Sequence, residues 1–125
     1  MLVHRRAWEK VGLFDERYFM YFEDADLCRR VRDAGFAIMV VPRAKLWHKV
    51  SLSAQRDKPQ NRYYRFLNQV RFYREHPHSA FVLLQIAYIV AQGLKTVVRD
   101  ILSGDWSVIG PTWRGIIDGY RPAVK

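Results

Sequence analysis

The fold is decided around residues 12–28, which read Gly12-Leu13-Phe14-Asp15-Glu16-Arg17-Tyr18-Phe19-Met20-Tyr21-Phe22-Glu23-Asp24-Ala25-Asp26-Leu27-Cys28. Three carboxylates in this stretch follow directly on a block of large aromatic side chains. Five of the twelve acidic residues lie between positions 15 and 26, although the formal net charge of the chain is +9. Acidic side chains grouped this closely either stabilise the start of a helix or hold an ion, a proton or a hydroxyl group.

The pattern after this group predicts a helix over residues 24–34. Apolar residues recur four positions apart, arginines fill its second half, and a glycine follows its end. In the simpler interpretation, Glu23 or Asp24 caps this helix and Asp26 pairs with Arg30 one turn later. In the other interpretation the same carboxylates carry out chemistry. This segment alone leaves both interpretations open.

Two segments downstream have the length of β-strands. Residues 36–41 are continuously apolar and end at Pro42, and residues 44–48 form a second short, strand-like segment that closes on His48. A strand, helix, strand order would place His48 at the rim of a sheet, where α/β folds usually build their sites. The sequence therefore predicts that an imidazole and a carboxylate meet at such a rim.

An ordered series of residues extends this pattern over the first part of the chain: Val11-Gly12-Leu13-Phe14-Asp15-Glu16, Phe19-Met20-Tyr21-Phe22-Glu23-Asp24-Ala25-Asp26-Leu27-Cys28, Arg30, Ala34-Gly35-Phe36, Val41-Pro42 and Trp47-His48. In order and spacing, this series resembles the second half of family 2 glycosyltransferases, especially the rhamnosyltransferase-like branch. The resemblance implies an α/β fold: the acceptor-side half of a GT-A, Rossmann-like catalytic domain in residues 1–55, followed by a mostly α-helical, basic extension in residues 56–125.

The resemblance also implies a reaction and a role for each matching residue. The activity would be inverting transfer of a sugar from a nucleotide-sugar donor to a glycan or glycolipid acceptor in cell-surface polysaccharide synthesis. Asp24 would be the general base that accepts the proton of the acceptor hydroxyl, which is a poor nucleophile at neutral pH. Glu23 and Asp26 would orient the acceptor or the base, Arg30 would pair with one of them, and His48 would bind a divalent metal.

One imidazole cannot hold such a metal, Mg or Mn, so the remaining ligands are expected from a missing N-terminal half. The family supplies its nucleotide pocket and an Asp-x-Asp metal motif upstream of the Glu-Asp pair, and neither precedes Glu23 here. The string Asp24-Ala25-Asp26 occupies the acceptor-side motif instead. We therefore expect a fragment of a longer transferase, unstable or oligomeric by itself and inactive alone, and a homo-oligomer is one expected form because an unpaired sheet edge invites association.

The second half is helical in pattern and basic. Aromatic and aliphatic residues recur three and four apart over residues 60–75, and residues 76–78 break that helix with a proline. Residues 80–94 are the most apolar stretch, but fifteen residues interrupted by glutamines and a glycine fall short of the ~20 that span a bilayer. A buried or interfacial helix is expected there.

Residues 79–121 allow two interpretations of this basic, aromatic tail. It rests peripherally on an anionic membrane surface, or it packs against the catalytic core or a second subunit. The sequence pI near 10.1 also suits nucleic acid, but the chain has no zinc-ligand set, RNP-type motif or helix-turn-helix pattern, so nucleic acid is the least favoured partner. The alternative to a transferase is thus a non-enzymatic basic module for anionic membrane or nucleic acid. The single cysteine and the lack of a signal-peptide pattern predict a cytoplasmic protein, on the inner face of the plasma membrane where the tail contacts lipid.

Overall fold

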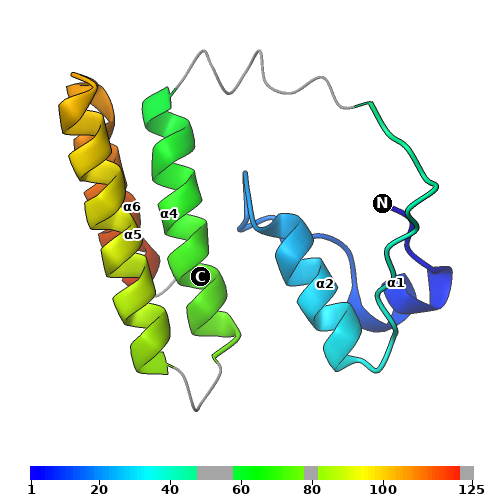
Figure 1. The fold of residues 1–125 in the computed structure, drawn as a ribbon. Helices are drawn as coiled ribbons and strands as arrows, with labels where there is room; N and C mark the ends of the chain where they lie inside the picture. The colour runs from blue at the N-terminus through cyan, green and yellow to red at the C-terminus, as the bar shows by residue number, and fades with distance from the viewer. Residues whose placement is uncertain (48–57, 78–81, 122–125) are drawn as a thin grey trace.

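The computed structural model describes residues 1–47, 58–77 and 82–121. The elements in these ranges are α1 (Arg5–Val11), α2 (Glu23–Asp33), α4 (Lys58–Glu75), α5 (Val82–Leu102), the 3₁₀ turn η1 (Trp106–Val108) and α6 (Ile109–Tyr120). Helices α4, α5 and α6 lie side by side as a bundle, and α1 and α2 form a smaller unit beside α4 (Figure 1). Each part has its own hydrophobic cluster.

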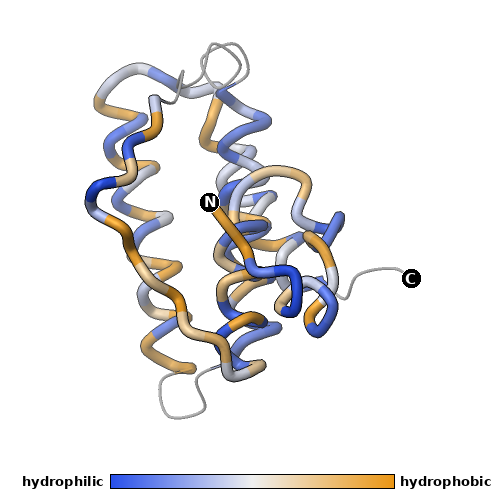
Figure 2. The backbone as a smooth tube through the Cα atoms, turned by 90° about the vertical axis from the view of Figure 1, so that its right-hand side faces the viewer, coloured by the Kyte–Doolittle hydropathy of each residue, from blue (hydrophilic) through white to orange (hydrophobic). Residues whose placement is uncertain are grey.

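The expected α/β fold is wrong, because the described residues contain helices and no strand. Residues 36–41 form coil, and so do 44–47 of the second expected strand, while His48 lies outside the described ranges. A strand needs a neighbour for its backbone N–H and C=O groups, and the described backbone offers none to these segments. Figure 2 shows the hydrophobic stretch 36–41 running as a single trace over the outside of the protein.

Helix α2 forms close to where the sequence predicts it and ends with a Schellman motif. The Phe36 amide donates to the Val31 carbonyl at 3.1 Å, and the Gly35 amide donates to the Arg32 carbonyl at 3.0 Å. Gly35 supplies the left-handed conformation that this ending requires, with φ at 88°. Phe36 then packs against the cluster of Ala7, Leu27 and Val31, so the apolar face of α2 is buried against α1.

Helices α4 and α6 pack unusually closely, and two glycines explain how. A Cβ atom on Gly115 would lie 2.5 Å from the Tyr63 carbonyl oxygen, and one on Gly119 would lie 2.6 Å from the Val70 Cβ. Any side chain at either position would push the helices apart. Between these glycines, Asp118 accepts a hydrogen bond from the Tyr63 hydroxyl at 3.1 Å. The Gly-x-x-Asp-Gly pattern is therefore the seam between α6 and α4.

Helix α5 is longer than the sequence pattern indicates. The expected helix over residues 80–94 extends in fact through Leu102, which gives 21 residues and a length of about 31 Å. By length and composition it could cross a membrane, and only 11% of its most apolar 18-residue window is buried inside the protein. The expectation that this stretch is too short to span a bilayer is therefore wrong. The expected boundary between residues 55 and 56 lies outside the described ranges.

Candidate functional site

The acidic end of α2 is presented by two residues in a left-handed backbone conformation. Tyr21 and Phe22, called the elbow below, have φ values of 68° and 70°. Such values cost residues with a Cβ about 1–3 kcal/mol each, and they persist only where the surrounding structure imposes them. Phe22 is the N-cap residue and gives no side-chain cap. Neither Glu23 nor Asp24 is the N-cap residue, and both carboxylates belong to the first helical turn. The expected capping is confirmed in part, because the Asp24 Oδ1 accepts a hydrogen bond from the first-turn amide of Ala25 at 2.8 Å.

Helix α4 holds the elbow in place. The fully buried side-chain amide of Asn68 donates to the Met20 carbonyl at 2.7 Å and to the Tyr21 carbonyl at 3.2 Å. The rings of Phe22 and Phe72 pack at a centroid distance of 5.5 Å. Directional hydrogen bonds and an aromatic contact thus fix the strained backbone just before the acidic pair.

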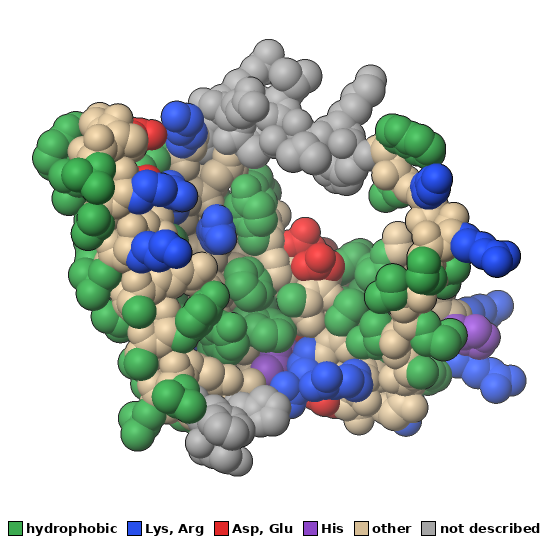
Figure 3. All heavy atoms as spheres, in the orientation of Figure 1, with side chains coloured by type: hydrophobic (Ala, Val, Ile, Leu, Met, Phe, Trp, Pro, Cys, Tyr) green, Lys and Arg blue, Asp and Glu red, His purple; other side chains and the backbone are tan. Residues whose placement is uncertain are grey.

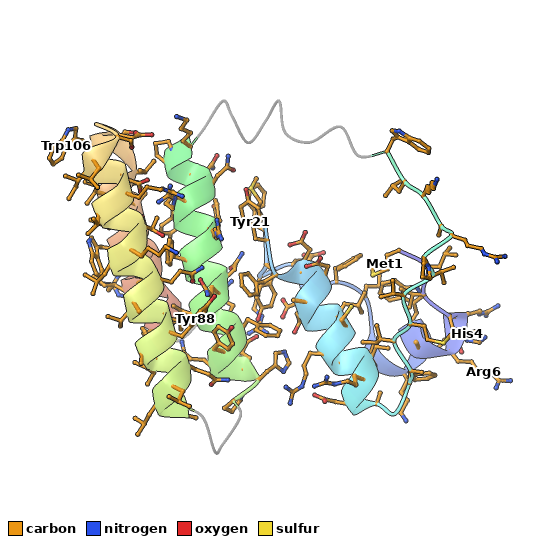
Figure 4. All side chains as sticks on the ribbon, in the orientation of Figure 1. Met1, His4, Arg6, Tyr21, Tyr88 and Trp106 are labelled. Atoms are coloured by element: carbon orange, nitrogen blue, oxygen red, sulfur yellow. The ribbon has the colours of Figure 1, made fainter. Side chains whose placement is uncertain are left out.

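Asp24 is the member of the acidic pair that faces solvent. It lines a hollow of about 370 Å³ together with Tyr21, Phe22, Ala25 and Arg65, called the α2 hollow below. Figure 4 shows the ring of Tyr21 standing between α4 and the start of α2, and Figure 3 shows acidic side chains at the start of α2 facing the same space. Glu23 differs, because its Oε2 atom is buried and has no hydrogen-bond partner among the described residues.

The α2 hollow combines three chemical features. It has a carboxylate at a helix N-terminus, where the helix dipole favours negative charge. It has two aromatic rings that offer flat apolar faces, and one guanidinium that donates hydrogen bonds in a planar fork. A ligand that has hydroxyl groups on an apolar ring fits this combination.

Asp26 and Arg30 connect helix α2 to the loop that follows α1. Asp26 is 2% exposed and pairs with the Arg30 Nε at 2.8 Å, as the sequence predicts. The Arg30 guanidinium also donates to the Val11 carbonyl at 2.6 Å and the Leu13 carbonyl at 2.9 Å. These contacts tie the loop after α1 to α2, so both side chains are occupied by partners within the protein.

His76 is a member of this network that the sequence does not reveal. Its Nε2 lies 2.8 Å from the Asp26 Oδ1, and its ring packs at 5.0 Å from that of Phe72. Asp26 and His76 are 50 positions apart, and local spacing carries no signal for such a pair. From the sequence, residues 76–78 are expected only to end the preceding helix, whereas His76 in fact joins α2 to the end of α4.

A second polar contact joins the same two parts nearby. The Arg17 guanidinium pairs with Glu75 at 2.8 Å and with Asp15 at 2.5 Å, and it holds the pKa of Asp15 below its usual range. Tyr18 donates its hydroxyl proton to Glu75 at 2.9 Å. Burial, followed by this hydrogen bond to a carboxylate, raises the pKa of Tyr18. The loop before the elbow is thus fixed to Glu75 at the end of α4.

The expected metal ligand, His48, lies outside the described ranges, and its role stays a prediction. Within residues 1–47, 58–77 and 82–121, no three His, Cys, Asp or Glu side chains are grouped as a metal site requires.

The chain is related to glycosyltransferases over part of its length. A segment of 57 residues, 46% of the chain, is 49% identical to two curated proteins of Mycobacterium tuberculosis, from strains CDC 1551 / Oshkosh and ATCC 25618 / H37Rv. Both are named N-acetylglucosaminyl-diphospho-decaprenol L-rhamnosyltransferase, a name that gives those proteins a lipid-linked sugar as acceptor. The matched segment spans 19% of the length of each relative. No family model matches the chain, and no solved structure is significantly similar to it.

Proposed function

We propose that this chain contributes the acceptor site of a sugar transferase that acts on a lipid-linked glycan. The 49% identity over 57 residues to L-rhamnosyltransferases carries the proposal. The α2 hollow supports it, because a carboxylate beside aromatic rings and a guanidinium suits a sugar hydroxyl as ligand. Family 2 membership, a nucleotide-sugar donor and inversion at the anomeric carbon are parts of the same proposal.

In the proposed reaction Asp24 is the general base. The acceptor hydroxyl oxygen attacks the anomeric carbon of the donor sugar while its proton passes to the Asp24 carboxylate. The bond from the anomeric carbon to the nucleoside diphosphate breaks, and the diphosphate leaves with the electron pair. Arg65 and Tyr21 border the same hollow and would orient the acceptor ring. A divalent ion, when bound, would stabilise the diphosphate, and it would need further ligands besides His48.

Two of the expected substrate-binding residues have a different place in this proposal. Asp26 and Arg30 act as positioning residues, since their contacts fix α2 and the loop after α1. Glu23 does not line the α2 hollow and its Oε2 is buried, so in this proposal it orients the neighbouring Asp24 and does not contact the acceptor.

The test is binding of the acceptor, which does not require a donor pocket. The purified chain is titrated in detergent with N-acetylglucosaminyl diphosphate carried on a short prenol, and with prenyl phosphate as the lipid lacking the sugar. We expect tighter binding of the sugar-bearing lipid and about tenfold weaker binding by Asp24→Asn, which loses a charge-assisted hydrogen bond.

Asp33→Asn is the matched control, because it removes a carboxylate that is half exposed at the other end of the same helix. Its affinity should equal that of the parent chain. Equal affinity for the two lipids, or equal losses in the Asp24 and Asp33 variants, would refute the acceptor site.

A further inference from the structure

Helix α5 exposes most of its large apolar side chains, whereas a helix of a water-soluble bundle buries them. Its outward side carries large apolar side chains, including Leu83 at 82%, Leu84 at 64%, Leu94 at 50%, Val98 at 54% and Leu102 at 83% exposed. These positions share one face at 100° per residue. Water is a poor solvent for so continuous an apolar face.

Two polar residues of α5, Gln92 and Asp100, point into the bundle instead. Gln92 hydrogen-bonds to Gln69 of α4 at 2.7 Å, and the buried Asp100 pairs with Arg62 of α4 at 2.5 Å. Polar groups directed inward and apolar groups directed outward are the arrangement of helices whose surroundings are hydrocarbon. The surroundings of α5 are therefore expected to be lipid on its outward side.

A basic groove runs along the flank of the apolar face. Four cations line it, together with Phe66, Gln92 and Thr96, in a volume of about 220 Å³: Arg62, Arg65, Lys95 and Arg99. Asp100 neutralises part of this charge through Arg62 at 2.5 Å and Arg99 at 3.2 Å, which leaves a net positive groove. Figure 3 shows Lys and Arg side chains gathered between α5 and α4, beside hydrophobic side chains along α5.

We propose that α5 lies in the plane of an anionic membrane, with its apolar face in the acyl layer and the basic groove at the phosphate headgroups. Charge complementarity selects this occupant: a strip of cations next to an apolar face matches the boundary between anionic headgroups and acyl chains. Trp106, 66% exposed at the end of α5, stands where an aromatic ring prefers the membrane interface (Figure 4).

The helix lies on the membrane and does not cross it, although its length would allow crossing. Helix α4 contacts α5 through the core cluster and carries four arginines along its length: Arg62, Arg65, Arg71 and Arg74. A crossing α5 would carry these arginines into hydrocarbon, which is costly for each charge. Lying in the plane leaves Arg62 and Arg65 at the headgroups and the rest of α4 outside the hydrocarbon.

The experiment measures sedimentation of the full chain with vesicles of phosphatidylcholine alone and of phosphatidylcholine with about one third phosphatidylglycerol. We expect binding to the anionic vesicles that weakens as salt is raised. Lys95→Gln with Arg99→Gln should reduce binding about thirtyfold, since each basic group at such a surface contributes about fivefold. Leu84→Ser and Leu94→Ser should each reduce it about tenfold.

The variants are chosen so that folding and the acceptor site are not disturbed. Lys95, Leu84 and Leu94 are exposed, and Asp100 keeps its contact with Arg62 when Arg99 is changed. Arg65 is left intact because it lines both the basic groove and the α2 hollow. The matched control, Arg43→Gln with Lys45→Gln, removes two exposed cations elsewhere and should bind within twofold of the parent chain, as should Asp24→Asn. Circular dichroism checks that the helix content is unchanged.

Three results would overturn the proposal. The first is a folded chain that sediments with neither vesicle but binds inorganic diphosphate, which would make the groove a site for a free anion. The second is an equal loss of vesicle binding in the Arg43 and Lys45 control. The third is a dimer that Leu84→Ser and Leu94→Ser convert to a monomer without any vesicle binding, which would make a second copy the occupant. Because Asp24→Asn should keep full vesicle binding, failure of the acceptor site and failure of membrane docking are separable.

Discussion

Gly115→Ala should destabilise the bundle strongly, although alanine is the better helix former. The added Cβ would lie 2.5 Å from the Tyr63 carbonyl oxygen and 3.2 Å from both the Leu67 amide nitrogen and the Phe66 Cβ. Two of these three atoms are backbone, so relief requires α4 and α6 to separate by roughly 1 Å to reach normal contact distances. That separation would also loosen the cluster around Phe66 and Ile116.

The magnitude follows from two opposing terms. Overpacking against atoms that cannot rotate away costs about 3 kcal/mol, the upper end of its usual range. Replacing a helical glycine by alanine returns about 1 kcal/mol. The net loss in the free energy of unfolding is therefore about 2 kcal/mol, or roughly 6–10 °C in Tm for a chain of this size.

Gly110→Ala is the control in the same helix, because a Cβ there meets nothing within 4 Å. It should be neutral or stabilise by up to about 1 kcal/mol. Urea denaturation followed by circular dichroism measures both variants. If Gly115→Ala proves as stable as Gly110→Ala, the close approach of α4 and α6 is refuted.

Three further predictions follow from the polar contacts and the matched segment. Burial raises the pKa of Asp100, but hydrogen bonds from Arg62 and Arg99 outweigh this effect, so the pKa lies below its ordinary value of 3.8. The stability that the Asp100 carboxylate contributes is therefore complete above pH 3.8 and is lost as the pH falls through the pKa of the folded state. Asp100→Asn should flatten the fall of Tm in this acid range. Asn68→Ala should lower the free energy of unfolding by about 1–3 kcal/mol, because it leaves the Met20 and Tyr21 carbonyls without their donor. The Asn68→Ala chain should also bind the N-acetylglucosaminyl lipid more weakly. An unchanged affinity would show that the elbow does not position Asp24. Exchange of the 57-residue matched segment into the M. tuberculosis relative should preserve L-rhamnosyl transfer to its lipid-linked acceptor, and a folded but inactive exchange enzyme would contradict the proposed function.

The helices could be predicted well where local spacing determines them. The expected helix over residues 60–75 is α4 apart from two residues at its start, and the expected helix over residues 24–34 is α2 shifted by one residue. The pair Asp26–Arg30 is confirmed for the same reason, since residues four apart on a helix always face each other. Each of these features depends only on residues within one or two turns.

The features that local sequence patterns predict wrongly are those that depend on distant residues. A continuous apolar run such as 36–41 favours a buried strand, but a strand forms only where distant residues supply a pairing partner. In the structure the run is coil, and its residues 38–41 are exposed. The apolar stretch predicts too short a helix, because it ends where Lys95 begins the polar positions of α5. In the structure Lys95 and Arg99 lie on the flank of the helix and Asp100 is buried in the bundle, so the helix continues. The contact between Asp26 and His76 joins positions 50 apart, which no local pattern encodes.

The junction between α2 and α4 also affects how the protein opens. The two hydrophobic clusters share no residue, and their buried members lie on separate helices. What joins the two parts near the elbow includes hydrogen bonds and ion pairs at Asn68, Glu75 and His76. Directional polar contacts of this kind give way before a packed apolar core does. The unit of α1 and α2, which carries Asp24, should therefore open and exchange its amide hydrogens while α4 and α6 are still protected from exchange. The segment that carries the candidate general base is thus expected to unfold locally before the bundle does.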